Sequence, residues 1–244
     1  MKVEDVSELT KAVKKRITAD WLQMFPGLAQ YEPMHLLRRV GPIVEGIVLE
    51  RTSSNDEYRP AFHVHSLLYA YPAVSLTMEQ PLLREATRAP ISVSVLRHPT
   101  FYVEAATTLS RQSPLSLEGD LRLSDVIHAY RQFSERSGLH YDAHQLYRDM
   151  VMICAWCGSD ERARALVDEG LVKLGAWPAN ILEQVGGRER WRERMLTAIA
   201  QPSALRETMK SQLQALKLSS LPVAQLICDA DISEQREQSE IGSD

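Results

Sequence analysis

Apolar residues recur at helical spacing near the beginning of the chain and change to strict alternation further on. The segment Glu4–Phe25 predicts an amphipathic helix, whose apolar positions are Val6, Leu9, Val13, Ile17 and Leu22. Pro26 and Gly27 follow this segment. We expect the helix to end there, because proline cannot continue the hydrogen-bond ladder and glycine permits the exit turn.

The next part of the chain predicts β-structure. Apolar and polar residues alternate, or β-branched residues gather, in four segments: Ile43–Glu50, Ala61–Leu68, Ala73–Met78 and Ile91–Leu96. Such alternation is typical of an antiparallel sheet that has one face on a core and the other toward solvent. The connections are short enough for consecutive strands to pair as a meander.

From Thr100 onward the pattern is helical. Thr100 and Ser124 are residue types that cap helix N-termini, and Pro202 suits a first helical turn. The predicted helices are Thr100–Arg111, Ser124–Ser137, Asp142–Cys157, Ser159–Leu174, Gly187–Ala200 and Pro202–Leu216, with a short turn opened by Pro222.

Strands followed by helices favour the α+β class over alternating α/β. We therefore predict an N-terminal helix on a four-stranded, mainly antiparallel sheet, followed by an all-helical C-terminal half. The predicted division is residues 1–98 for the helix and sheet, 99–228 for the helical region, and 229–244 for a disordered acidic tail.

One predicted helix pair resembles the tetratricopeptide hairpin over about 34 residues. Tyr147, Gly158 and Ala163 match that family's pattern, whereas Val151 stands where the family has glycine and Cys154 where it has tyrosine. The resemblance implies an antiparallel pair of helices.

Composition and charge narrow the classes of function. The chain has 244 residues, 44% of them hydrophobic and 25% charged, and a net charge of -4. The last 16 residues hold six acidic residues and one basic residue, so the rest is close to neutral. A dedicated nucleic-acid binder usually has a basic excess, which makes nucleic acid an unlikely partner. No apolar run approaches the roughly 20 residues that cross a bilayer, so we also expect no membrane.

The cysteines and the N-terminus predict the compartment. The chain has three cysteines, an odd number: Cys154, Cys157 and Cys228. The N-terminal segment lacks the pattern of a secretory signal, which is a basic region followed by an apolar one. We expect reduced thiols in a cytoplasmic protein. The spacing of Cys154 and Cys157 also occurs in redox and zinc sites, but within an apolar helix it favours core packing.

The arginine-rich segment 188–194 favours a solvated helix face with Trp191 and Met195 turned inward.

His63 and His65 are the first candidates for chemistry. On a strand both imidazoles project from one face, roughly 6.6 to 6.8 Å apart along the chain, so they could share a ligand or a metal. The sequence has no third donor at metal-ligand spacing. The alternative interpretation is that both histidines belong to the polar face of a half-buried sheet.

His98, Pro99 and Thr100 suggest an enzymatic alternative. A His-x-Thr or His-x-Ser element on each of two strands is typical of two-histidine phosphoesterases, and the segment 98–100 resembles one such element. The segment His63–His65 departs from the second element, because it has histidine where a hydroxyl belongs. The resemblance implies a phosphoesterase or metal-assisted hydrolase that uses His63, His65 and His98.

The sequence otherwise has none of the common catalytic motifs, and we predict no catalytic residues, no metal and no cofactor. The hypothesis is a non-enzymatic protein-binding module, for example a bacterial accessory or toxin-neutralising immunity protein. Its partner is another protein, and the acidic tail would engage a basic one. The predicted binding surface is the face of the sheet that points away from the core, and its residues are His63, His65, Ser75, Thr77, Ser92 and Ser94. If helices cover this face, these residues are only polar groups packed in the interior.

Overall fold

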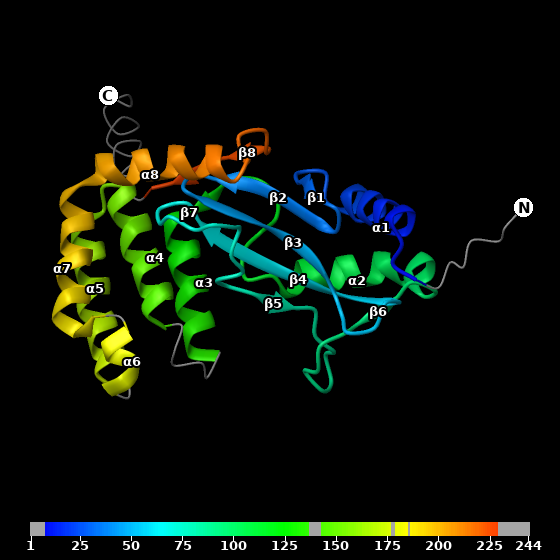
Figure 1. Ribbon diagram of the computed structural model, residues 1–244, viewed down its shortest axis with the longest axis horizontal. Helices are drawn as coiled ribbons and strands as arrows, with labels where there is room; N and C mark the ends of the chain where they lie inside the picture. Colours follow the sequence, from blue (N-terminus) through cyan, green and yellow to red (C-terminus); the bar gives the residue numbers. More distant parts are fainter. Residues whose placement is uncertain (1–7, 137–142, 177–178, 185, 229–244) are drawn as a thin grey trace, which may run out of the picture.

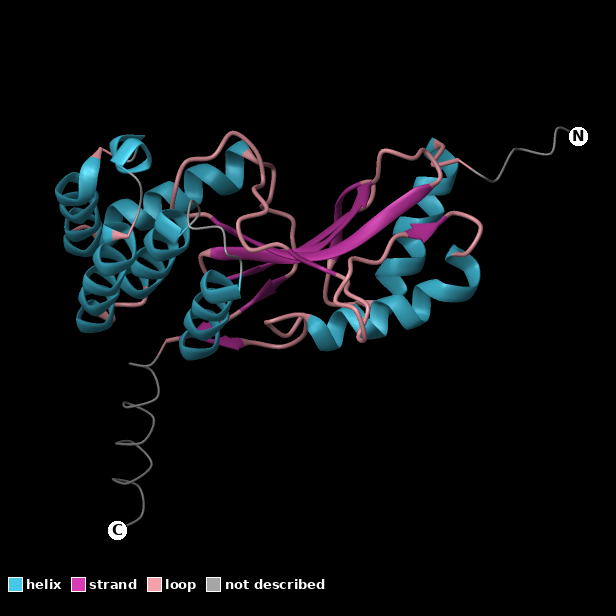
Figure 2. Cartoon of the chain, turned by 90° about the horizontal axis from the view of Figure 1, so that it is seen from below, coloured by secondary structure: helices cyan, strands magenta, loops and turns pink. Residues whose placement is uncertain are grey.

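A twisted sheet lies in the middle of the molecule, and helices pack at both of its ends (Figure 1, Figure 2). The computed structural model describes residues 8–136, 143–176, 179–184 and 186–228. The α+β class is confirmed. The strands are β1 (Ala29–Glu32), β2 (His35–Val40), β3 (Ile43–Arg51), β4 (Glu57–Ser66), β5 (Gln80–Pro81), β6 (Val93–Ser94), β7 (Leu121–Arg122), β8 (Val223–Ala224) and β9 (Leu226–Ile227). The helices are α1 (Lys11–Met24), α2 (His98–Gln112), α3 (Leu123–Arg136), α4 (Ala143–Trp156), α5 (Asp160–Gly175), α6 (Ala179–Gln184), α7 (Gly187–Ala200) and α8 (Pro202–Ala215).

The main sheet is mostly antiparallel, as predicted. Its strand order is β1-β2-β3-β4-β5, with β6 also paired to β4 and with β8 parallel to β2. The long hairpin of β3 and β4 forms its centre, with Ile43 opposite Ser66 and Arg51 opposite Tyr58. β7 and β9 form a separate parallel pair.

Most predicted helices are present, with shifted ends. The side chain of Thr10 caps α1 by accepting a hydrogen bond from the Val13 N–H at 3.3 Å, so the described helix begins at Lys11 rather than at Glu4. Thr100 does not cap α2. That helix begins two residues earlier, and the Thr100 hydroxyl donates to the carbonyl of Arg97. The bounds of α7 are those predicted, and Trp191 and Met195 on it are buried as expected.

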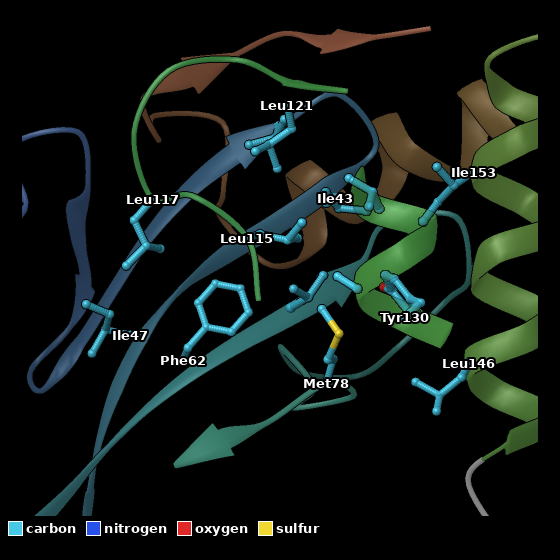
Figure 3. Close-up of a cluster of buried hydrophobic side chains, with 14 of the residues drawn as sticks. Ile43, Ile47, Phe62, Met78, Leu115, Leu117, Leu121, Tyr130, Leu146 and Ile153 are labelled. Carbon is cyan, nitrogen blue, oxygen red and sulfur yellow. The ribbon is translucent and has the colours of Figure 1, made fainter. Parts of the chain in front are cut away.

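Both faces of the sheet's centre are covered. On one face Ile43, Ile47 and Phe62 pack against Leu117 and Tyr130, which come from the helical half (Figure 3). On the other face a second cluster joins strand residues to α8 and the residues after it, namely Leu37, Val44, Leu67, Leu216, Leu218 and Leu221. The prediction that one face lies toward solvent is therefore wrong for this part of the sheet.

Two of the four predicted strands differ in the structure: one is absent and the other is much shorter. Residues 73–78 form no strand. The N–H of Ser75 donates to the imidazole of His65 at 3.0 Å, so a side chain takes the place of a strand partner. The segment Ile91–Leu96 shrinks to the two residues of β6. Conversely, β1 and β2 were not predicted, because β2 is buried on both faces and so lacks clear alternation.

The core continues from the sheet into the helical region. One buried cluster includes Ile17 and Phe62 from residues 1–98 together with Tyr130, Leu166 and Met195 from residues 99–228. The division at residue 98 stays a prediction, and the predicted tail 229–244 lies outside the described residues. No helix in the described part of the chain is long and apolar enough to cross a membrane.

The cysteines differ from the expectation of reduced thiols. Cys157, which directly follows α4, forms a disulfide with Cys228, which directly follows β9. Cys154 is buried in α4, as core packing predicts. Nothing in the sequence spacing indicated this pairing, because the two partners are 71 residues apart.

Reducing this disulfide is expected to lower the free energy of unfolding by about 4 kcal/mol, because a bond that closes a loop of 71 residues strongly restricts the unfolded chain. Urea unfolding of the oxidised protein, of the reduced protein and of the Cys157→Ser/Cys228→Ser variant measures this. The reduced protein and the variant should agree. An unfolding midpoint that does not respond to reductant would contradict the pairing.

Candidate functional site

His63 and His65 occupy the same face of β4, as predicted, but both are buried with 0% exposure. His63 lies opposite Gly46 of β3, and His65 lies opposite Val44. Of the two alternatives that the sequence left open for this face, the covered one therefore holds at both histidines. The hypothesis that they meet a partner directly is not compatible with this burial.

His35 of β2 joins this cluster, and the sequence did not single it out. Its Nε2 atom lies 2.7 Å from Nε2 of His63, so the two imidazoles share a hydrogen bond. The pair meets across β3, next to Gly46, which has no side chain to separate the rings. A Cβ atom at Gly46 would lie 1.9 Å from the carbonyl oxygen of Leu36, so the close approach of β2 also requires glycine here.

Ser75 and Thr77 do lie beside the buried histidines. Nδ1 of His65 is 2.8 Å from the Ser75 hydroxyl, which is itself 2.8 Å from the Thr77 hydroxyl. Because Nδ1 accepts from the Ser75 N–H, the neutral ring of His65 has its proton on Nε2. That Nε2 atom and Nδ1 of His63 are buried without a hydrogen-bond partner among the described residues.

Burial keeps these imidazoles neutral at pH 7. It lowers the pKa of His35 and of His65 to about 4. The pKa of His63 falls well below its usual value, first through burial and then through the neighbouring His35 and His65. Within the described part of the chain, no three histidine, cysteine or acidic side chains come close enough to hold a metal ion.

The remaining predicted residues lie elsewhere. Ser94 lies in β6 opposite Glu57, at the far end of β4 from His65, and Ser92 precedes it in the same segment. His98 is on the other face of the sheet, where Nδ1 lies 2.7 Å from the hydroxyl of Tyr58. Alternate residues of a strand point to opposite faces, so Tyr58 and His63 point away from each other. His63, His65 and His98 therefore do not converge.

His98 belongs to a buried hydrogen-bond chain. The indole N–H of Trp21 donates to the Tyr58 hydroxyl at 3.1 Å, and Nε2 of His98 lies 2.9 Å from a carboxylate oxygen of Asp20. These bonds join α1, β4 and the first turn of α2. They give His98 a structural role in connecting three elements.

A groove of about 750 Å³ opens beside the histidine cluster. It lies between α1, the turn from β1 to β2 and the second half of β3, and His35 is part of its wall. Apolar side chains and the stems of lysines line much of it. The lining residues are Leu9, Lys11, Lys14, Lys15, Gln30, Glu32, Pro33, Met34, His35, Val48, Leu49, Glu50 and Arg51.

The lysines give the groove its chemical character. Lys11, Lys14 and Lys15 follow one another along α1, whose first turn has no acidic residue. None of the three forms an ion pair with a side chain in the part of the chain that the structure describes. The sequence contained this signal: apart from Glu8, which stands three positions before Lys11, no acidic residue lies three or four positions from these lysines.

The chain is an α+β protein with a partly apolar groove, whose lining carries four basic side chains and two acidic ones: Lys11, Lys14, Lys15, Arg51, Glu32 and Glu50. No protein-family model, no curated protein and no solved structure matches the chain. Its function therefore has to be inferred from the groove and from the rest of its own surface.

Proposed function

We propose that this protein is a non-enzymatic protein-binding module, and that its docking site is the groove between α1, β2 and β3. The observation that supports the proposal is the combination of an apolar floor, which includes Met34 and Leu49, with three lysines that have no described acidic partner. The occupant that this lining fits is an acidic, amphipathic segment of a partner protein.

Charge and apolar area contribute differently to such an interface. The lysine ammonium groups attract acidic residues over a distance of about 8 to 10 Å at ordinary salt, and they mainly accelerate association. The apolar floor supplies the area that holds the complex together. A partner segment with carboxylates on one side and apolar residues on the other satisfies both parts of the groove.

The first experiment identifies the occupant by chemistry. The tagged protein is purified from its native cell and treated with a carbodiimide, which joins a lysine amine directly to a neighbouring carboxylate. We expect mass spectrometry to find Lys11, Lys14 or Lys15 linked to aspartate or glutamate of a partner. The cross-linked segment is then synthesised as a peptide. Links that fall only on lysines outside the groove would overturn the proposal.

The second experiment measures the peptide against a charge-reversed groove. The Lys11→Glu/Lys14→Glu/Lys15→Glu variant should bind about tenfold more weakly or worse, with the larger loss at low salt. The matched control reverses three exposed basic residues elsewhere, Lys173, Arg192 and Lys210, and should bind as the natural chain does. Equal losses in both variants would show a general charge effect and contradict the assignment of the groove.

The hypothesis of a toxin-neutralising immunity protein is one case of this proposal, and the identity of the captured partner tests it. Cytoplasmic location is a further proposal. Disulfides persist mainly in oxidising compartments, so the redox state of Cys157 in the native cell tests the location.

A further inference from the structure

The three cysteines of the chain meet at the C-terminal end of α4. Cys157 is disulfide-bonded to Cys228, and the Cα atoms of the two residues are 5.6 Å apart. Cys154 precedes Cys157 by one helical turn and carries a thiol, because it is not disulfide-bonded. Cys157 therefore has two cysteines beside it, and only one of them is its present partner.

The backbone of α4 remains helical as far as Cys157. The N–H of Cys157 donates to the carbonyl of Ile153 at 3.1 Å, and the chain then turns away at Gly158, whose φ is 76°. Residues three apart in an α-helix have their Cα atoms about 5 Å apart. Disulfides form at Cα distances of about 4.4 to 6.8 Å. The helix therefore holds Cys154 and Cys157 at a spacing that a disulfide can bridge.

The three cysteines differ in their access to solvent. Cys154 is 0% exposed and Cys228 is 8% exposed, whereas Cys157 is half-buried. Burial hinders attack by a thiol from solution, but a thiol on the same helix is already next to the bond. The arrangement therefore favours exchange within the protein over reduction from outside.

The disulfide fastens the segment 222–228, which contains β8 and β9. Each strand has two residues, and β8 pairs with β2 whereas β9 pairs with β7. Leu226 is buried, but Val223 is 61% exposed. Short elements with few backbone hydrogen bonds open locally before the rest of a protein does. We therefore expect the bond from Cys157 to Cys228 to contribute much of the attachment of this segment.

We propose that the three cysteines form a thiol–disulfide exchange site, in which Cys157 changes its partner from Cys228 to Cys154. Cys154 first loses its proton to water. Its sulfur then attacks the sulfur of Cys157, a Cys154–Cys157 bond forms, and the Cys157–Cys228 bond breaks with its electron pair on Cys228. Cys228 takes up a proton. One disulfide and one thiol are present before and after, so the step requires no oxidant or reductant.

The exchange releases the segment 222–228 while the protein keeps a disulfide. Arg39 and Val40 of β2 and Leu121 of β7 lose their strand partners, and Leu226 leaves its buried position. Open strand edges beside an apolar side chain are surfaces on which another chain can pair. This site is separate from the groove and does not depend on the partner proposed for it.

Disulfide mapping of the full oxidised chain tests the exchange. The protein is kept at pH 8.5 without reductant, because only the thiolate attacks. It is then acidified, unfolded and alkylated, and mass spectrometry identifies the alkylated cysteine. We expect the label on Cys154 at the start and increasingly on Cys228 within about a day, at a rate independent of protein concentration. The proposal is overturned if Cys228 remains unlabelled or if the rate increases with concentration.

Two cysteine variants test the attacking group and the helix geometry. Cys154→Ala removes the attacking sulfur, so Cys228 should stay unlabelled. Equal labelling of Cys228 in this variant would assign its release to outside thiols and contradict the proposal. Cys228→Ser leaves only the helical pair, which should oxidise to a Cys154–Cys157 disulfide. If both thiols persist under oxidation, the helix cannot close this bond and the exchange does not occur.

Two substitutions within the segment test its release. Leu226→Ala removes a buried side chain and weakens the attachment, so it should raise the ratio of Cys228-labelled to Cys154-labelled protein at least about tenfold. Val223→Ala is the matched control, because this side chain is exposed and its loss should change the ratio less than about twofold. Equal ratios in the two variants would show that the segment stays in place when Cys157 changes its partner.

Discussion

Replacing Arg38 by methionine is expected to lower the free energy of unfolding by about 3 to 5 kcal/mol. Arg38 and Glu45 face each other across β2 and β3, and their side chains are only 4% and 0% exposed. Two arginine N–H groups donate to Oε1 of Glu45, at 2.8 and 2.6 Å. Without the guanidinium, the carboxylate would stay buried with no opposite charge. Urea unfolding at pH 8 measures the loss.

Arg38 also holds a loop against the sheet. It donates to the carbonyl of Gly119 at 2.8 Å and to that of Ser116 at 2.9 Å. The double variant Arg38→Met/Glu45→Leu removes both charges but also these two bonds. If the unpaired carboxylate of Glu45 causes most of the loss in free energy of unfolding, the double variant should regain most of the lost stability. Equal destabilisation of single and double variants would assign the cost to the loop instead.

The neighbouring residue supplies a matched control. Arg39 is next in β2, points to the opposite face and is half-buried. Arg39→Met removes the same charge and adds the same side chain, but it does not leave a buried carboxylate without an opposite charge. We expect a loss below about 1 kcal/mol for this variant, which is the usual value for a side chain at the surface.

The pH dependence of the Arg38→Met variant distinguishes a buried charge from poor packing. Burial raises the pKa of Glu45 to about 7, although Arg38 opposes the rise. Removing Arg38 raises this pKa further, so the folded variant binds a proton that the unfolded chain releases near pH 4.5. The contribution of Glu45 to the stability of the variant should therefore be largest below about pH 4.5 and fall as the pH increases through 7, which is measured as the difference in pH dependence between the variant and the natural chain. A packing defect would not change with pH.

The strands show what local patterns can and cannot predict. β3 and β4 are long enough to give a periodic signal. β3 was predicted within one residue of its bounds, whereas β4 begins four residues before the predicted Ala61 and ends two residues before the predicted Leu68. The helices α5, α7 and α8 were predicted within one residue of their observed bounds, and Pro202 lies in the first turn of α8 as expected. Residues 73–78 alternate equally well but form no strand, since the bond between Ser75 and His65 is a tertiary contact that no local pattern contains.

The candidate site was less predictable for the same reason. The sequence correctly placed His63 and His65 on one face and drew attention to Ser75 and Thr77. It could not show that α8 and the following residues cover this face, nor that His35 reaches His63 across β3. The groove combines α1 with residues up to 40 positions away, so only the folded chain brings its lysines and its floor together.

Acid is expected to destabilise the protein through the buried histidines. The pKa values of His35 and His65 are about 4 in the folded protein, below the ordinary value of 6.5. The unfolded chain therefore binds protons that the folded chain does not. The stabilising effect is fully present above pH 6.5 and is lost as the pH falls through 4. Each histidine contributes up to about 3 kcal/mol to this loss, measurable by urea unfolding from pH 7.5 to pH 4.

Variants that keep the hydrogen bonds but do not titrate isolate this effect. Gln at position 63 can supply a polar atom near the place of Nε2, and Asn at position 65 can supply an acceptor near the place of Nδ1. The His63→Gln/His65→Asn protein should lose less stability between pH 6.5 and pH 4 than the natural chain. The exposed His128 is the control, because His128→Gln should leave the pH dependence unchanged.

Other buried groups act in the opposite direction and make the comparison between variants necessary. Burial raises the pKa values of Glu45 and Asp149, so these carboxyls favour the folded state as the pH falls. The natural protein therefore shows the sum of both effects, and its total pH dependence alone cannot identify the histidines. A double variant with the same pH dependence as the natural chain would mean that water reaches the cluster and that its imidazoles are not held neutral by burial.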